Sequence, residues 1–127
     1  MYEAVLFDFG GVFTQSPFEV VRLHGAEIGA LAETTGLGVD PFTAFAKFGT
    51  GGAMADAMVE RTRRLRADGY RTALVTNNVK EFGDGWRTLI PVDELFEVVI
   101  DSSHAGVRKP DPAIFALATD ALGVAPE

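Results

Sequence analysis

The sequence contains no cysteine. A disulfide framework, a thiolate metal site and a cysteine nucleophile are therefore excluded for this chain. It also has no apolar run near the roughly 20 residues that cross a membrane, and no basic, apolar N-terminal segment typical of a secretory signal. We therefore expect a soluble cytoplasmic protein without a membrane partner.

Positive charge is scarce. The chain has 11 Lys and Arg against 18 Asp and Glu, a formal net charge of −7. A nucleic-acid or anionic-membrane surface requires clustered positive side chains, so the composition argues against both partners. An anionic substrate would need positive groups placed locally. With 127 residues, 47% of them hydrophobic, the chain can form one domain with a real core.

The first apolar stretch, residues 4–7, runs directly into Asp8 and then into two glycines. This pattern predicts a buried parallel strand that ends in a tight turn. Ligands of open α/β sheets bind outside the carboxyl ends of the strands, which places Asp8 at the mouth of a site. An ordinary aspartate capping a turn remains the alternative on this stretch alone. If the loop turns back, the backbone N–H groups of Phe9, Gly10 and Gly11 can cradle an anion.

Two further apolar stretches, 71–76 and 97–101, end at Thr76 and Asp101. Strands alternating with helices predict a parallel α/β sheet, and right-handed crossovers place Asp8, Thr76 and Asp101 on one rim. For Asp101 a turn cap is favoured over a metal ligand. Helices are expected over 17–35, 41–48, 53–67, 79–89 and 109–122, with a helical turn at 91–96 and a loop at 102–108.

Asp8, Thr76 and Lys109 supply the parts needed for phosphoryl transfer through an aspartyl intermediate. The reaction needs a carboxylate nucleophile, a hydroxyl for the other oxygens, and a cation against developing charge. The chain offers them in that order. Asn77 is expected to add a donor to the phosphate site; forming a turn with Asn78 is its alternative.

These residues resemble three motifs of the haloacid dehalogenase superfamily, in the branch with a helical cap after the first strand. Asp8 with Thr14 resembles the first motif, residues 74–78 (LVTNN) the second, and residues 108–115 (RKPDPAIF) the third. The resemblance covers nearly the whole chain. The residues of these motifs also resemble those of the phosphatase-like domain found beside epoxide hydrolases and in some acyl-CoA dehydrogenase fusions.

The resemblance implies a Rossmann-like three-layer sandwich, with a core of residues 1–14 and 53–127 and a short cap of residues 15–52. It implies a phosphatase that hydrolyses a small anionic phosphate ester with Mg²⁺, held by the Asp8 carboxylate and the Gly10 carbonyl. The implied catalytic residues are Asp8 as nucleophile and Lys109, and the implied phosphate-binding residues are Thr76, Asn77, Phe9, Gly10 and Gly11.

Two departures from the family pattern matter. Gly10 stands where family phosphatases carry a second aspartate that shuttles the proton, so weak activity or none is expected. The fourth, acidic motif is absent, which predicts an incomplete Mg²⁺ site and an open apolar edge at residues 4–7 that invites a homodimer. Either the sequence is a truncated hydrolase, which we favour, or a second chain supplies the missing part. Two alternatives stay open: hydrolysis at carbon, as in 2-haloacid dehalogenases, and a degenerate, non-catalytic domain that binds a partner.

Overall fold

A computed structural model describes residues 1–35, 53–80 and 83–126. Within them a sheet is formed by β1 (Ala4–Phe7), β2 (Arg71–Thr76) and β3 (Val98–Asp101), in the order β1-β2-β3. Both pairings are parallel, with Phe7 beside Leu74 and Thr76 beside Asp101. The three strands therefore end at the same rim, as the sequence predicts.

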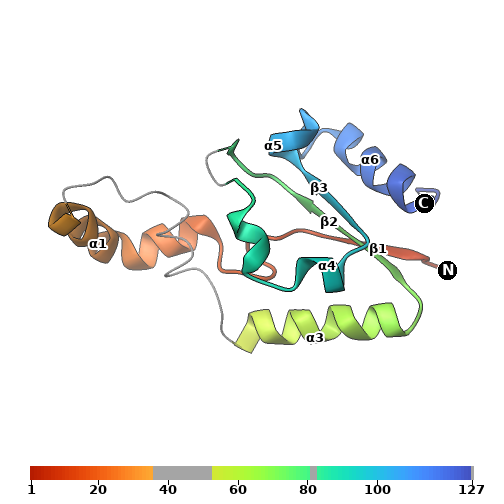
Figure 1. Cartoon of the computed structure of the whole chain (residues 1–127), viewed down its shortest axis with the longest axis horizontal. Coiled ribbons are helices and arrows are strands. Elements are labelled where there is room, and N and C mark those ends of the chain that lie inside the picture. Colours follow the sequence, from red (N-terminus) through yellow and green to blue (C-terminus); the bar gives the residue numbers. More distant parts are fainter. Residues whose placement is uncertain (36–52, 81–82, 127) are drawn as a thin grey trace.

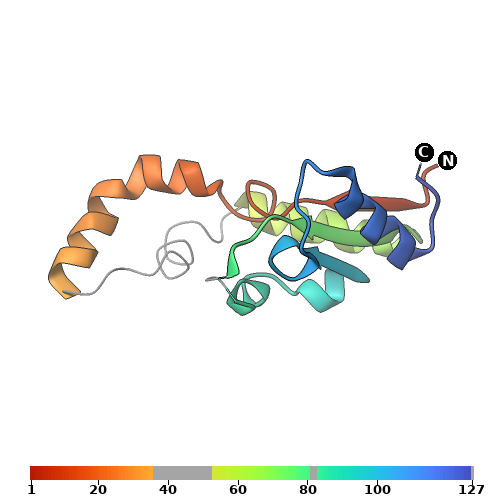
Figure 2. The ribbon, with the colours of Figure 1, turned by 90° about the horizontal axis from the view of Figure 1, so that it is seen from above.

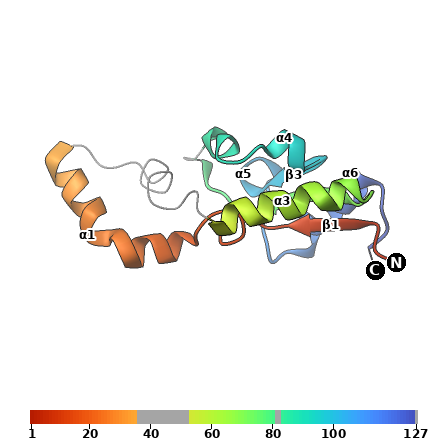
Figure 3. The same ribbon diagram turned by 90° about the horizontal axis from the view of Figure 1, so that it is seen from below.

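Helices cover both faces of this sheet (Figure 1). One face carries α3 and α4, and α6 lies on the other, while α1 extends beyond the carboxyl ends of the strands (Figures 2 and 3). The helices are α1 (Pro17–Thr35), α3 (Ala53–Ala67), α4 (Val92–Leu95), α5 (Ser102–Ala105) and α6 (Pro112–Leu122), with the 3₁₀ turn η2 (Gly85–Thr88). The α/β sandwich of three layers is confirmed.

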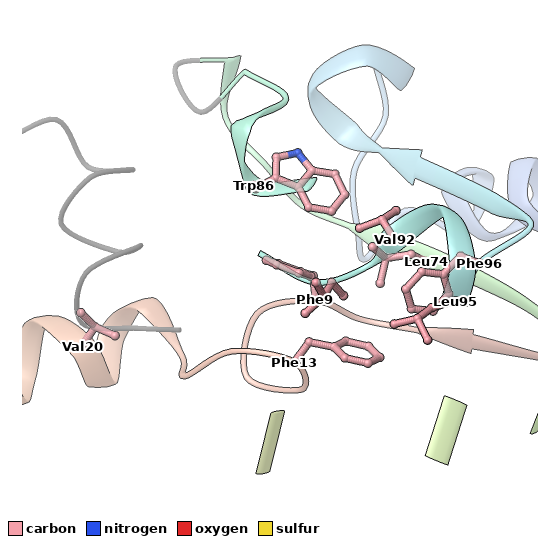
Figure 4. Packing of buried hydrophobic residues seen from close by; sticks show 9 residues of the cluster. Phe9, Phe13, Val20, Leu74, Trp86, Val92, Leu95 and Phe96 are labelled. Atoms are coloured by element: carbon pink, nitrogen blue, oxygen red, sulfur yellow. The ribbon is translucent and has the colours of Figure 1, made fainter. Parts of the chain in front are cut away.

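The two cores follow from the period-two alternation of the strands. Along β2, Leu74 belongs to the core under α3 and α4, whereas Ala73 and Val75 belong to the core under α6. The first core also holds the buried rings of the loop after β1 and the tryptophan of η2 (Figure 4). The loop after β1, which begins at Asp8, is therefore anchored in the hydrophobic core.

The boundaries of α6 show why the chain turns where it does. The Asp111 side chain accepts a hydrogen bond from the Ala113 N–H at 2.9 Å, and Pro112 occupies the first turn. At the other end Gly123 adopts a left-handed conformation with φ of 68°. An aspartate N-cap, a proline in the first turn and a C-terminal glycine are the ordinary signals of helix ends.

Some expected elements differ. A helix over 79–89 is wrong: the described part of this stretch contains no α-helix, because Gly83 takes a φ of +52° and Trp86 turns inward to be buried. Residues 102–108 are not all loop, since Asp101 caps the short α5. The helices expected over 17–35 and 53–67 and the turn within 91–96 are confirmed. The helix expected over 109–122 begins only at Pro112, because Asp111 is its N-cap. The helix expected over 41–48 lies outside the described residues.

β1 is an edge strand, as expected, and all four of its residues are partly exposed. Pairing of this edge with a second chain stays a prediction. None of the helices in the described ranges has the length and apolar character of a membrane span.

Candidate active site

The structure brings Lys109 onto Asp8 across a separation of 101 residues. The Lys109 ammonium donates to Asp8 Oδ1 at 2.6 Å and to the carbonyl of Val75 at 2.8 Å. The side chain of Lys109 is 21% exposed and that of Asp8 is 49% exposed, so the pair faces solvent at the sheet rim. A carboxylate and an ammonium held this closely place a cation beside any anionic group that meets the aspartate.

The loop after β1 turns back sharply. Phe9 accepts hydrogen bonds at its carbonyl from the N–H groups of Val12 and Phe13, and Gly11 adopts a φ of +84° that favours glycine. Gly10 and Thr14 form an isolated bridge that closes the turn. The Phe9 N–H, expected as an anion donor, here donates to Asp8 Oδ1 at 2.8 Å and so fixes the carboxylate.

Asp8 keeps one carboxylate oxygen open. Oδ1 accepts from both the Phe9 N–H and the Lys109 ammonium, whereas Oδ2 accepts no hydrogen bond from any residue in the described ranges. A carboxylate that is oriented through one oxygen and open at the other is suited to attack with the open one.

Thr76 lies at the carboxyl end of the central strand, next to Asp101 in register, and is 2% exposed. Its hydroxyl makes no hydrogen bond within the described part of the chain. Since no fully buried side-chain oxygen or nitrogen there lacks a partner, this hydroxyl must reach the surface of the rim. It is therefore available to a ligand at the strand ends.

Asn77 contacts the backbone of Lys109. Its Oδ1 accepts from the Lys109 backbone N–H at 2.8 Å, and its Nδ2 donates to the Lys109 carbonyl at 3.0 Å. The neighbouring Asn78 turns away from Lys109: its Nδ2 donates to Asp101 Oδ2 at 2.9 Å. The two asparagines thus have separate partners.

Asp101 is a turn cap, as favoured from the sequence. Its carboxylate accepts from the N–H and hydroxyl of Ser103, from Asn78 and from the Trp86 indole at 3.2 Å. Burial acts to raise the pKa of Asp101, but hydrogen bonds from Asn78 and Ser103 outweigh it and leave that pKa below its usual value. The carboxylate is fully occupied by protein donors, so nothing in this arrangement points to a metal ligand.

Sequence reasoning missed Trp86. It is 1% exposed and meets the Phe9 ring edge to face, with centroids 5.0 Å apart. Figure 4 shows Trp86 and Phe9 in the same cluster of buried residues. Because the Trp86 indole also donates to Asp101, Asp101 is linked through it to the loop that carries Asp8. The available signal is that a buried tryptophan requires a partner for its N–H, and this is the chain's single tryptophan.

We expect Asp101→Ala to lower the free energy of unfolding by about 3 kcal/mol, because it leaves buried donors unpaired. Asp101→Asn tests the charge separately. Since the folded-state pKa of Asp101 is lowered, its contribution is present above the usual value of 3.8 and is lost as the pH falls through the folded value. Urea unfolding between pH 7 and pH 3 should therefore show a steeper loss for the natural chain than for Asp101→Asn; equal slopes would contradict this. Asp93→Asn, at a side chain 93% exposed, is the control.

The described residues supply only part of a magnesium site. Asp8 and the Gly10 carbonyl offer oxygens, but no group of three or more Asp, Glu, His or Cys side chains suited to a metal gathers anywhere in the described ranges. Mg²⁺ demands six oxygens in near-octahedral geometry and takes several from water and substrate phosphate. The donor set fits a weakly held ion at most.

Comparison with known proteins places this chain in a family. The model of the haloacid dehalogenase-like hydrolases matches residues 26–127. Acyl-CoA dehydrogenase family member 10 of Mus musculus is 37% identical over 70 residues, which are 54% of this chain and 6% of that protein. Glyceraldehyde 3-phosphate phosphatase of Pyrococcus furiosus is 38% identical over 68 residues, 50% of this chain and 27% of that protein. The matched segments thus span less than a third of these curated relatives.

Solved structures share the fold. A dehalogenase crystal structure superposes with a TM-score of 0.66 at 17% identity and covers 99% of this chain and 74% of its own. A haloacid dehalogenase family enzyme of Bacteroides thetaiotaomicron, in complex with magnesium and inorganic phosphate, gives 0.65 at 18% identity and covers 98% and 80%. At such identities the likeness speaks for the fold alone.

Proposed function

The chain belongs to the haloacid dehalogenase-like hydrolases, and on that premise we propose that it is a phosphatase-type hydrolase acting on small phosphate monoesters through an aspartyl-phosphate intermediate. The observation that carries the proposal is the Asp8 carboxylate, which is held at Oδ1 by Lys109 at 2.6 Å and open at Oδ2. The similarity to phosphatases named for glyceraldehyde 3-phosphate and phosphoglycolate supports the substrate class.

In the proposed reaction Asp8 Oδ2 attacks phosphorus and forms an acyl phosphate, while the ester P–O bond breaks and its electron pair leaves with the alkoxide. The Lys109 ammonium, which already donates to Asp8, stabilises the negative charge on the transferring group. The Thr76 hydroxyl donates to a non-transferring oxygen. Water then hydrolyses the acyl phosphate and restores the Asp8 carboxylate.

Protonation of the leaving group is the weak step of this proposal. The residue two beyond the nucleophile is Gly10, which has no side chain to give a proton. A missing general acid typically costs about 10²–10⁴ in rate. We therefore expect turnover mainly of esters whose leaving group needs no proton, such as 4-nitrophenyl phosphate.

We propose that Mg²⁺ assists, with the Asp8 carboxylate and the Gly10 carbonyl as its protein ligands. A bound magnesium ion would neutralise phosphate charge. Its remaining oxygens would come from water and substrate, so we expect weak affinity. We also propose that residues 15–52, which include α1 at the carboxyl ends of the strands, form the cap over this site (Figure 1).

The test is phosphate release from 4-nitrophenyl phosphate by the purified chain, with Mg²⁺ in the millimolar range or with EDTA. We expect release with Mg²⁺ and a loss with EDTA. A crystal soaked with Mg²⁺ and beryllium trifluoride should carry the acyl-phosphate mimic on Asp8. Absence of both phosphate release and the mimic would overturn the proposal.

Gly10 also favours a second candidate, hydrolysis at carbon, because dehalogenases of this superfamily likewise lack the second aspartate. Here Asp8 Oδ2 would attack the carbon that bears the halogen, and halide would leave without needing a proton. Halide release from a 2-haloacid in the presence of EDTA separates the two, since the phosphatase reaction should require Mg²⁺.

A further inference from the structure

The catalytic lysine lies on a segment that has no strand partner of its own. Lys109 stands between Gly106, which ends α5, and Asp111, which caps α6. Nothing in the ladder of the sheet fixes this segment, yet its ammonium must meet Asp8 within hydrogen-bonding distance. Some other contact must therefore set the position of the lysine backbone.

Asn77 makes that contact. Both polar atoms of its amide bond the backbone of the same residue, with Lys109 N–H to Oδ1 at 2.8 Å and Nδ2 to the Lys109 carbonyl at 3.0 Å. This pair of hydrogen bonds satisfies the backbone N–H and the backbone carbonyl of Lys109, as a neighbouring strand would do in a sheet. It also fixes the backbone in two directions at once, which a single hydrogen bond does not do.

The same strand end holds the other end of the lysine. The Val75 carbonyl accepts the ammonium at 2.8 Å, two residues before Asn77 along β2. β2 is the central strand and is buried from Thr72 to Thr76. The buried strand β2 therefore holds the amine of Lys109 through Val75, and Asn77, the residue that follows β2, holds its backbone, with the side chain directed at Asp8.

We propose that Asn77 is a positioning residue, which acts on the reaction by clamping Lys109 rather than by binding the phosphate. The division of labour within the second motif follows from the contacts. The Thr76 hydroxyl makes no hydrogen bond within the described residues, whereas both polar atoms of the Asn77 side chain bond the Lys109 backbone. The kinetic consequence of the clamp rests on the proposed phosphatase activity, but the clamp itself does not.

The clamp can be tested without turnover, by acylating the intact chain with a limiting amount of acetic anhydride and locating the label by mass spectrometry. Lys80 is exposed and serves as the internal reference. In the natural chain Lys109 should react about tenfold more slowly than Lys80, because its amine is held by two hydrogen bonds. Asn77→Ala should remove most of that protection.

Asn78→Ala is the matched control: it deletes the adjacent amide, which bonds Asp101 and not Lys109. It should leave the Lys109 protection unchanged. Asn77→Asp, which keeps the acceptor for the Lys109 N–H but cannot donate to its carbonyl, should fall between the natural chain and Asn77→Ala. If the Asn77→Ala variant does not fold, the Asn77→Asp variant still measures the effect of the clamp on Lys109 protection. Unchanged protection of Lys109 in both Asn77 variants would overturn the proposal.

A double-mutant cycle with 4-nitrophenyl phosphate gives the kinetic reading. If Asn77 acts through Lys109, Asn77→Ala lowers kcat, and adding it to Lys109→Ala costs little more than Lys109→Ala alone. If Asn77 binds phosphate directly, the two losses multiply and KM rises, which overturns the proposal. Should the natural chain release no phosphate, the proposed function fails while the acylation result still decides the clamp.

Discussion

Replacing Gly10 by aspartate is expected to speed hydrolysis of an unactivated alkyl phosphate by about 10²–10⁴-fold. The new carboxyl group would stand two residues after Asp8, where it can protonate the leaving oxygen and then activate water. The backbone permits the change, because Gly10, unlike Gly11, is not among the glycines with positive φ. The measurement is kcat/KM for an alkyl phosphate in the natural chain and the variant.

Gly10→Asn is the matched control, since it has the size of aspartate but no proton to give, and we expect no gain from it. Turnover of 4-nitrophenyl phosphate should rise far less than that of the alkyl ester, because its leaving group needs no proton. An equal gain with both esters, or with both variants, would show that the substitution acts on folding or binding and not on proton transfer.

The sheet could be predicted because its strands carry their signal locally. Residues 71–76 have an apolar centre at 73–75, follow a glycine that ends a helix and stop at a polar residue, and β2 has these bounds. The stretch over 79–89 failed for the opposite reason. Its spacing is helical, but Gly83 in a left-handed conformation and the burial of Trp86 override the spacing. The burial of one large side chain determined the conformation of that segment, and the spacing of apolar residues does not predict such burial.

In the candidate site, too, some contacts could be predicted from the sequence and others could not. Asp8 and Lys109 could be predicted as a pair because phosphoryl transfer through an aspartate needs a carboxylate and a cation, and the structure places them 2.6 Å apart. The partners of Asn77 could not be predicted, because an asparagine beside Thr76 suits a phosphate, a turn or a backbone equally well. Only the packing of the segment before α6 onto the end of β2 shows that Asn77 bonds Lys109.

Asp8→Asn is expected to reduce turnover of 4-nitrophenyl phosphate by about 10³-fold or more, because the amide cannot form the acyl phosphate. The fold should survive. The Asp8 side chain is 49% exposed, an exposed ion pair contributes at most about 1 kcal/mol, and Lys109 keeps its hydrogen bond to Val75. Initial rates and thermal unfolding of both proteins check the two parts.

Asp93→Asn provides the matched control, since it removes a carboxylate from α4, on a side chain 93% exposed. Its turnover should equal that of the natural chain. If Asp8→Asn also kept the natural rate, the phosphate release would come from elsewhere, and the chain would be the degenerate, partner-binding domain that its Gly10 allows. If Asp8→Asn lost turnover while its unfolding temperature stayed within a few degrees, the loss would belong to the Asp8 carboxylate itself.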